Sequence, residues 1–337
     1  MKYMMNESRI KELFRKLELQ TQESNSYRVL SLTPYDHKLG KSSEGYPKFF
    51  ISVNEQSAYI KNIIREFLSV EYNQICIVED EEGNKLKDTF AIITLKSHEW
   101  ALQSYFIDIV FLIFQKMQSR PTKKELMLQV ETLITIFSAL QNPPVKKLQG
   151  LWGELLVIEQ GKHLETLINA WHNSPNAKFD FTLGRDKIEV KTTSSETRIH
   201  QFSLDQLNPS PNSRLLIASI TVRESGKGNG GKSIQDLYDS ICSKVSGTQE
   251  RLHLFEVIAN SVGKDINRLD SVFFDYVEAI DSLTYYKAQD VPRILKSNVP
   301  AGVTEVEFRS NLTDVPSVMN TESYSDYLNS PLFKSIF

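Results

Sequence analysis

Two carboxylates and a lysine near the middle of the chain stand in an arrangement that suits phosphodiester hydrolysis. Asp180 lies in one short apolar segment, Glu189 and Lys191 lie in the next, and Gly184-Arg185-Asp186 separates them as a turn. In an antiparallel pair of strands, this spacing brings Asp180 and Glu189 together at one end. Because Glu189 and Lys191 are two positions apart, they share one face of their strand. We therefore expect two carboxylates and an ammonium group at one point.

Such a group is typical of metal-dependent chemistry. Carboxylate oxygens are the ligands that Mg²⁺ prefers, and this ion keeps several of its waters when it binds. It neutralises a phosphodiester oxygen and lowers the pKa of a water. A lysine ammonium can orient that water or stabilise the developing charge. We therefore expect a hydrolase that acts on phosphodiester bonds with Mg²⁺ as cofactor, for which Mn²⁺ can substitute.

A purely structural explanation of the same residues stays open. A solvated hairpin edge commonly carries a cross-strand ion pair, and Asp180, Glu189 and Lys191 would satisfy that description. Glu189-Val190-Lys191 is the only Glu-x-Lys in the sequence, and Asp36-His37-Lys38 is the only Asp-x-Lys. The latter follows a proline and precedes a glycine without an apolar strand around it, so it predicts a loop.

Further residues around this segment make the chain resemble the PD-(D/E)xK nuclease superfamily. Its pattern has an acidic residue on a first helix, an aspartate on the next strand and Glu-x-Lys on the strand after, as Glu154, Asp180, Glu189 and Lys191 do here. The chain is similar in particular to an uncharacterised bacterial family assigned to this superfamily and often encoded near DNA methyltransferases and ATPases in defence loci. The residues that carry this similarity are Gly150-Leu151-Trp152-Gly153-Glu154-Leu155, Trp171, Phe179-Asp180-Phe181, Ile188-Glu189-Val190-Lys191-Thr192-Thr193, Arg198, His200, Phe202-Ser203 and Gln206-Leu207.

The resemblance implies an α/β fold with a restriction-endonuclease-like core, a central mixed sheet flanked by helices. It implies a Mg²⁺-dependent DNA endonuclease of a restriction or anti-phage system, in which Asp180 and Glu189 bind metal, Glu154 is a further metal or water ligand and Lys191 is catalytic. Phe179 stands where the superfamily's name has proline, a departure that affects only the shape of the strand. The implied partners are DNA, methyltransferase or ATPase subunits and a second copy of the chain. The alternative is a DNA-binding or scaffold subunit of the same fold that does not cut.

Three polar residues after the Glu-x-Lys are secondary candidates. Arg198, His200 and Gln206 are predicted to contact the scissile phosphate or the DNA backbone, with capping or core contacts as the alternative. His163 and His172 have no cysteines nearby and no partners at the spacing typical of zinc, so we expect no zinc site.

A glycine-rich segment offers a competing function. Gly226 to Ser233 satisfies the phosphate-loop pattern GxxxxGK[ST] and lies between an expected strand over 214–222 and an expected helix over 234–245. Arg223-Glu224-Ser225 separates that strand from the loop, whereas phosphate loops spring directly from a strand end. A nucleotide-binding protein is therefore the less favoured hypothesis.

The surrounding patterns predict the elements that must position these residues. A helix over 145–161 carries Glu154, short strands cover 178–182 and 187–193, and a β-like run covers 271–280. We expect an N-terminal α/β region over 1–120 for recognition or partner contact, the nuclease core over 121–248 and a C-terminal extension over 249–337.

Composition sets the outer limits. Of the 337 residues, 40% are hydrophobic and 24% charged, which excludes a disordered or collagen-like chain. The formal net charge of −3 excludes a globally basic nucleic-acid coat but not a local basic groove. The two cysteines, in no metal-type spacing, indicate a reducing cytoplasm. A membrane-spanning helix needs about 20 apolar residues, and no apolar run here comes close to that length. We therefore expect a cytoplasmic protein without membrane contact.

Overall fold

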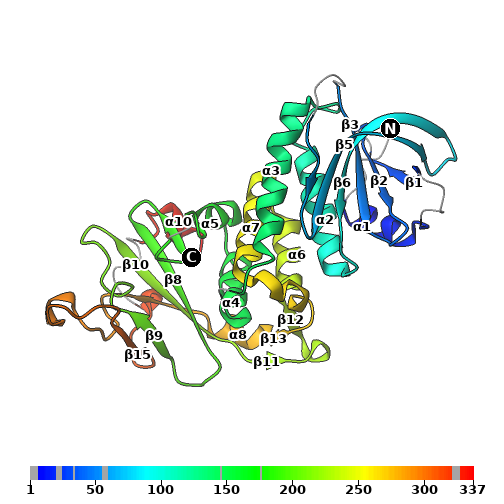
Figure 1. The fold of residues 1–337 in the computed structure, drawn as a ribbon. Helices are drawn as coiled ribbons and strands as arrows, with labels where there is room; N and C mark the ends of the chain where they lie inside the picture. Colours follow the sequence, from blue (N-terminus) through cyan, green and yellow to red (C-terminus); the bar gives the residue numbers. More distant parts are fainter. Residues whose placement is uncertain are drawn as a thin grey trace. The chain divides into compact units, whose positions relative to one another are not determined.

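The computed structural model describes residues 7–19, 25–32, 35–54, 60–144, 146–174, 177–320 and 327–337. The chain forms two compact units, Met1–Pro143 and Pro144–Phe337, and both mix helices with strands (Figure 1). The expected α/β class is thus confirmed. The division falls after α3 (Lys123–Ala139) and not at residue 120, because α3 packs on α2 (Trp100–Phe114) and β5 (Leu68–Glu79) of the first unit.

The first unit is built on a six-stranded sheet in the order β1-β2-β3-β6-β5-β4. β1 also pairs in parallel with β5, which closes the sheet on itself. β5 and β6 form an antiparallel hairpin. The remaining bounds in this unit are α1 Glu7–Lys16, β1 Ser26–Ser31, β2 Lys38–Lys41, β3 Pro47–Ser52, β4 Ile63–Ile64 and β6 Lys85–Leu95.

The second unit contains a mixed four-stranded sheet in the order β14-β10-β8-β7. β8 (Asp186–Thr193) runs parallel to β10 (Arg214–Thr221), and β7 (Phe181–Leu183) and β14 (Thr284–Lys287) pair antiparallel at the two edges. Seven of the eight residues of β10 are buried, as expected for a strand that is covered on both faces. Because β14 comes from the segment expected to be a C-terminal extension, that segment contributes directly to the central sheet.

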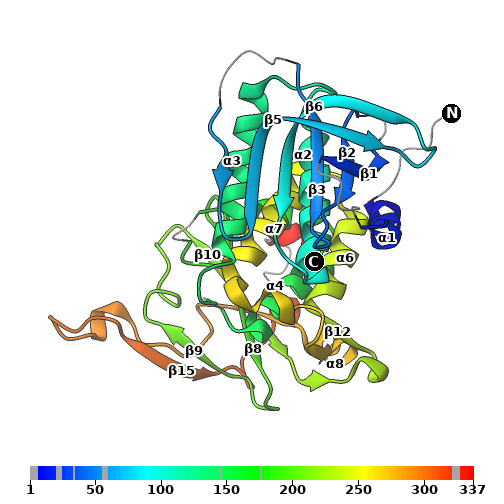
Figure 2. The same cartoon turned by 45° about the vertical axis from the view of Figure 1, so that its right-hand side comes forward.

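Helix α4 (Leu148–Glu159) lies directly on this sheet. It packs on β8 on one side and on α6 (Ile234–Lys244) on the other, as the turned view in Figure 2 shows. A Cβ at Gly153 would come within 2.4 Å of the Thr192 methyl group, so this glycine permits the close approach of helix and strand. The carboxylate-bearing neighbour, Glu154, is thereby placed against the sheet.

Other elements surround this core. α5 packs on α7, α8 packs on β10, and β9 and β15 pair antiparallel beside β8. Their bounds are α5 Leu164–Ala170, β9 Ile199–Ser203, β11 Glu224–Ser225, β12 Gly231–Ser233, α7 Thr248–Val262, β13 Phe273–Asp275, α8 Tyr276–Ser282, β15 Glu307–Asn311 and α10 Pro331–Lys334, with 3₁₀ turns at Lys227–Asn229, Gly263–Arg268, Lys296–Asn298 and Val318–Asn320.

The strand expected over 271–280 is wrong in its second half. Only Phe273–Asp275 is a strand, β13, and the chain then enters α8. The Asp275 side chain accepts a hydrogen bond from the Glu278 N–H and caps this helix. A cap of this kind satisfies a helix donor that would otherwise lack a partner, and it outweighs the β propensity of the apolar residues.

The glycine-rich segment does not form a phosphate nest. Gly231, Lys232 and Ser233 pair with β13 as a strand, so their backbone belongs to a ladder. Ser233 also caps α6 through a reciprocal capping box with Asp236, and the Lys232 Nζ lies 3.4 Å from the centre of the Tyr276 ring. The Ser233 hydroxyl and the Lys232 ammonium, which a phosphate loop would direct at a nucleotide, thus contact other parts of the protein, so the structure does not favour nucleotide binding by this segment.

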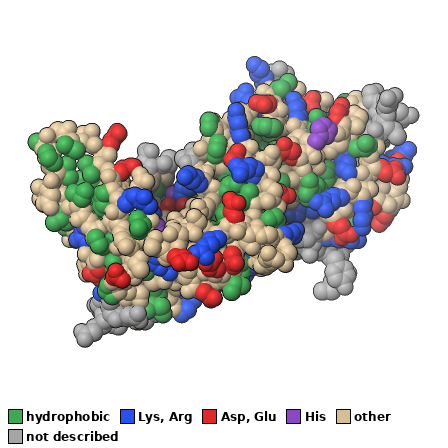
Figure 3. All heavy atoms as spheres, turned by 90° about the horizontal axis from the view of Figure 1, so that it is seen from below, with side chains coloured by type: hydrophobic (Ala, Val, Ile, Leu, Met, Phe, Trp, Pro, Cys, Tyr) green, Lys and Arg blue, Asp and Glu red, His purple; other side chains and the backbone are tan. Residues whose placement is uncertain are grey.

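The described surface shows no single-sign face in the view of Figure 3. Basic and acidic side chains of the described residues are interspersed there, in keeping with the small net charge. None of the helices in the described part of the chain combines the length and the apolar character that crossing a bilayer requires.

Candidate active site

The β7–β8 hairpin brings the predicted residues together. In the hairpin Phe181 pairs with Ile188, so the same register places Asp180 opposite Glu189, and Asp180 Oδ2 accepts a hydrogen bond from the Val190 N–H at 2.8 Å. Lys191 Nζ lies 2.8 Å from Glu189 Oε1, so both side chains share one face. Ile188 and Val190 are buried on the other face, as the alternation predicted.

A first group, which we call the Asp180 cluster, consists of Lys146, Glu154, His172 and Asp180. Lys146 Nζ lies 2.5 Å from Glu154 Oε1 and 3.2 Å from Asp180 Oδ1. His172 Nε2 lies 2.9 Å from Glu154 Oε2 and 3.6 Å from Asp180 Oδ1. The buried Trp171 indole N–H also donates to Glu154 Oε2, at 2.8 Å. Two carboxylates thus share an ammonium and an imidazole.

A second group, the Glu189 cluster, consists of Glu189, Lys191 and Gln206. The Gln206 amide donates to Glu189 Oε1 at 2.5 Å, and its Oε1 accepts from the Ser203 N–H at 3.0 Å and from Lys191 at 3.3 Å. The Lys191 ammonium also lies 5.1 Å from the centre of the Phe202 ring. Glu189 Oε2 is buried and has no hydrogen-bond partner among the described residues. Glu189 is thus held through one of its two oxygens.

The two groups differ in their electrostatics. Burial alone would raise the pKa of Glu154, but the charges and hydrogen bonds of Lys146 and His172 outweigh it and hold this pKa well below its usual range. Burial and the neighbouring Glu154 carboxylate raise the pKa of Asp180. Burial, with the charge of Asp180, raises the pKa of Glu189 to about 8. The site therefore holds more carboxyl groups than its own cations neutralise.

Comparison with known proteins places the chain in a family. Residues 10–313 match the family described as "Putative PD-(D/E)XK family member, (DUF4420)". The chain belongs to this family. The match confirms the resemblance inferred from the sequence. No curated protein and no solved structure matches the chain.

PD-(D/E)XK nucleases typically use divalent metals, and the donor set of this family member fits one. Ligand atoms of Glu154, His172 and Asp180 all lie within 4.8 Å of one another. Two carboxylates and an imidazole are common ligands of divalent cations. The Lys146 ammonium among them shows that the same cradle stabilises a positive charge. The unpartnered Glu189 oxygen adds a further buried acceptor nearby.

Of the secondary candidates, the structure brings only Gln206 to the carboxylates. Arg198 donates to the carbonyl and hydroxyl of Ser219, each at 2.9 Å, and to the Ser282 carbonyl at 2.5 Å. His200 is buried, with its Nε2 2.8 Å from the Ser219 hydroxyl. Arg198 and His200 therefore join β9 to β10 and α8 in this structure, and their contact with a substrate stays a prediction.

Sequence reasoning missed Lys146, His172 and the role of Trp171. Lys146 lies in the segment before α4, and His172 has a left-handed backbone (φ 41°), which is uncommon for a residue with a side chain. No spacing rule connects either residue to Glu154 or Asp180. The available signal was Trp171, because a buried indole N–H usually finds a hydrogen-bond partner, and here that partner is Glu154.

Proposed function

We propose that the protein is a metal-dependent endonuclease that hydrolyses phosphodiester bonds in DNA. The observation that carries this proposal is the burial of three carboxylates: Glu154, Asp180 and Glu189 are 4%, 9% and 3% exposed. Glu154 and Asp180 share the Lys146 ammonium, and Glu189 contacts Lys191. At a solvated hairpin edge such carboxylates would stay in water, and no free energy of desolvation would be lost. Ionised groups are kept out of water at a cost of several kcal/mol unless charges or metals compensate, so this arrangement supports a functional site in a PD-(D/E)XK family member.

The residues divide the work. Glu154, His172 and Asp180 would hold a divalent cation, with Glu189 as a further ligand. When bound, that cation neutralises a phosphodiester oxygen and lowers the pKa of a water. Lys191, which Glu189 and Gln206 hold in place, stabilises the developing charge on the phosphate or orients the attacking water. In-line attack of that water would leave a 5′-phosphate. We propose Mg²⁺, with Mn²⁺ as a substitute.

Lys146 favours one alternative that deserves a direct test. Its ammonium already pairs with Glu154 and Asp180, which are two of the proposed metal ligands. If it stays there in the presence of divalent metal, the protein would be the DNA-binding or scaffold subunit of a complex and would not cut. If metal displaces it, the ammonium lies beside the cation and can contact the substrate.

The wider setting is also a proposal. The mixed sheet, with α4 and α8 packed on it and α6 packed on α4, supports a restriction-endonuclease-like core in the second unit. The likeness to a family often encoded near methyltransferases and ATPases supports a role in restriction or anti-phage defence in the cytoplasm, with such subunits or a second copy as partners.

The test is a cleavage assay on methylated and unmethylated plasmid. The full chain is incubated with Mg²⁺, Mn²⁺ or EDTA, with and without the neighbouring gene products. We expect nicked or linear products with 5′-phosphate ends in either metal and none in EDTA, and none for Asp180→Asn. Cleavage by Asp180→Asn at the wild-type rate would refute the site, and metal binding without any cleavage would favour the scaffold subunit.

A further inference from the structure

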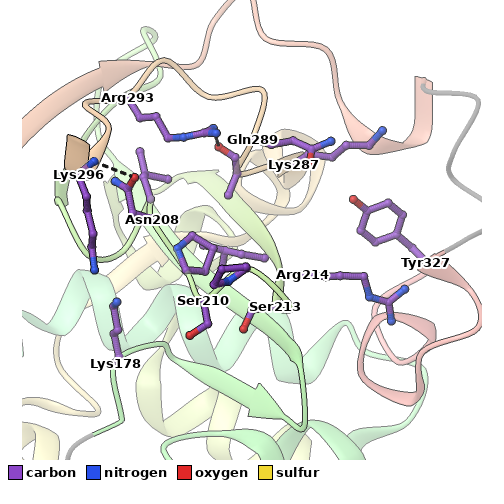
Figure 4. A pocket seen from close by; sticks show the side chains of 15 residues that line it. Lys178, Asn208, Ser210, Ser213, Arg214, Lys287, Gln289, Arg293, Lys296 and Tyr327 are labelled. Atoms are coloured by element: carbon purple, nitrogen blue, oxygen red, sulfur yellow. Dashed lines mark hydrogen bonds between the residues drawn. The ribbon is translucent and has the colours of Figure 1, made fainter. Parts of the chain in front are cut away.

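A basic cavity of about 630 Å³ lies in the second unit and is not lined by the carboxylates of the site. Its lining includes five cationic side chains and no acidic one, namely Lys178, Arg214, Lys287, Arg293 and Lys296. Figure 4 shows that these side chains come from opposite sides of the cavity, with Lys178 and Lys296 on one side and Arg214 and Lys287 on the other. A concave site of this size is typical of one that binds a small molecule or a part of a larger one.

Two carboxylates of described residues form ion pairs with the cationic lining of the cavity. Asp186 binds Arg214 through both oxygens, at 2.6 and 2.7 Å. Asp205 lies 3.7 Å from Lys178 and 2.6 Å from Lys296. The lining itself thus contributes five cationic side chains and no carboxylate. An excess of this kind attracts anionic ligands, phosphates in particular.

The walls of the cavity are held in place. The Asn208 side-chain amide donates to the carbonyls of Leu204 and Ile294, at 2.8 and 2.9 Å, and its oxygen accepts from the Lys296 N–H at 3.3 Å (Figure 4). This one side chain joins the segment after β9 to the loop that carries Arg293 and Lys296. The basic groups are therefore positioned before any ligand arrives, which lowers the entropy cost of binding.

The cavity is continuous in sequence with the candidate active site. Leu207 lines it and directly follows Gln206 of the Glu189 cluster, and Lys178 lies two positions before Asp180. A strand whose phosphate occupies the carboxylate site would thus meet the cavity with a neighbouring nucleotide.

The lining also offers flat apolar surface. Tyr327, Pro209 and Pro211 contribute to it, and the Tyr327 ring centre lies 5.9 Å from Lys287 Nζ and 6.0 Å from the Arg214 guanidinium carbon. Bases stack on aromatic rings in sites that bind single strands, while Lys and Arg follow the backbone. Cationic groups and a ring in one cavity match the two halves of a nucleotide.

We propose that this cavity binds an unpaired nucleotide of the substrate strand, with its phosphates among Lys178, Lys287, Arg293 and Lys296 and its base against Tyr327. The inference rests on the proposed function, which it deepens by naming an unpaired strand as the substrate. A free nucleotide offers the same phosphate and base, so the experiment must distinguish a free nucleotide from a nucleotide within a strand.

The test measures the binding of a fluorescein-labelled 20-nucleotide single strand to the full chain by anisotropy in EDTA. Arg293→Gln combined with Lys296→Gln should weaken binding about tenfold. The slope of log K against log salt concentration should also become shallower by roughly 1.4, since two phosphate contacts at about 0.7 each are lost. Lys287→Gln provides an independent variant. Lys264→Gln, an exposed lysine of the same unit outside this lining, is the control and should stay within twofold of wild type.

The remaining measurements distinguish the outcomes. Circular dichroism and thermal melts verify that each variant is folded. Competition by deoxythymidine monophosphate and by inorganic phosphate measures the binding of the free ligands to each protein. If the variants lose the free ligands but bind the strand as wild type does, the assignment of the cavity to a strand would be overturned. Wild-type strand affinity in both the double variant and Lys287→Gln would refute the cavity. Because EDTA prevents metal-dependent cutting, these results are independent of whether the protein cleaves.

Discussion

The Asp180 cluster and the Glu189 cluster lie on one hairpin, yet they treat buried charge in opposite ways. In the first, Lys146 and His172 contact both carboxylates. In the second, Lys191 and Gln206 both contact the same oxygen of Glu189, and its other oxygen is buried without a partner among the described residues. The difference is that the charges of the first group are compensated within the chain, whereas Glu189 is paired through only one of its oxygens.

The largest expected effect concerns the Glu189 cluster. Lys191→Met removes the ammonium that we propose faces the reacting phosphate, so cleavage should fall by roughly 1000-fold while the fold persists. The assay is the rate of plasmid nicking in Mg²⁺. Lys187→Met is the matched control on the same strand, since Lys187 Nζ contacts the Gly184 carbonyl, and it should cut within a few-fold of wild type. An equal decrease in the nicking rate of the two variants would contradict a specific role of Lys191.

The next effect concerns the cation of the Asp180 cluster. Lys146→Met leaves Glu154 and Asp180 buried together without their ammonium, which should cost about 3 kcal/mol and lower the melting temperature in EDTA by roughly 6 to 12 °C. Mn²⁺ should raise the melting temperature of this variant more than that of wild type, because no ammonium competes for the carboxylates. Lys147→Met, at an exposed neighbouring position, is the control. A metal-induced shift no larger than in wild type would argue against a metal at these carboxylates.

A third test compares the two glutamates directly. Glu154→Gln removes a charge on which Lys146, His172 and Trp171 all depend, so it should destabilise the protein by about 2 kcal/mol. Glu189→Gln should change stability by less than about 1 kcal/mol near pH 7 without metal, since the raised pKa of Glu189 already favours its neutral form. Urea unfolding in EDTA measures both changes. Similar decreases in the free energy of unfolding for the two variants would contradict the proposed difference between the clusters.

The smallest effect concerns His200, which lies outside both clusters. Burial and the charges of Lys191 and Arg198 lower the pKa of His200 to about 4, below its unfolded value. Its neutral form is therefore favoured in the folded state, so its contribution is complete above about pH 6.5 and is lost as the pH falls toward 4. Between pH 7.5 and 5.5, wild type should lose about 1 kcal/mol more than His200→Gln. His163→Gln, at an exposed histidine, should follow wild type; an identical pH profile for His200→Gln would contradict a buried neutral imidazole.

Much of the local structure followed from sequence pattern. The helix that carries Glu154, the hairpin that carries Asp180 and Glu189, and the shared face of Glu189 and Lys191 are all present. These features depend on period 2 or 3.6 and on turn residues a few positions apart. The strand expected beyond residue 275 failed because a single capping side chain decided the conformation of the next turn.

By itself, the sequence determined the residue types of the site and their order along the chain. It also determined the hairpin spacing that pairs Asp180 with Glu189, because side-chain alternation is a local property of a strand. Only the tertiary structure decided that Lys146 and His172 enter the Asp180 cluster, that Arg198 and His200 do not, and that a basic cavity lies beyond Gln206. Such contacts join elements far apart in sequence, and they follow from how α4 and its flanking segments pack on the sheet, which no short-range pattern encodes.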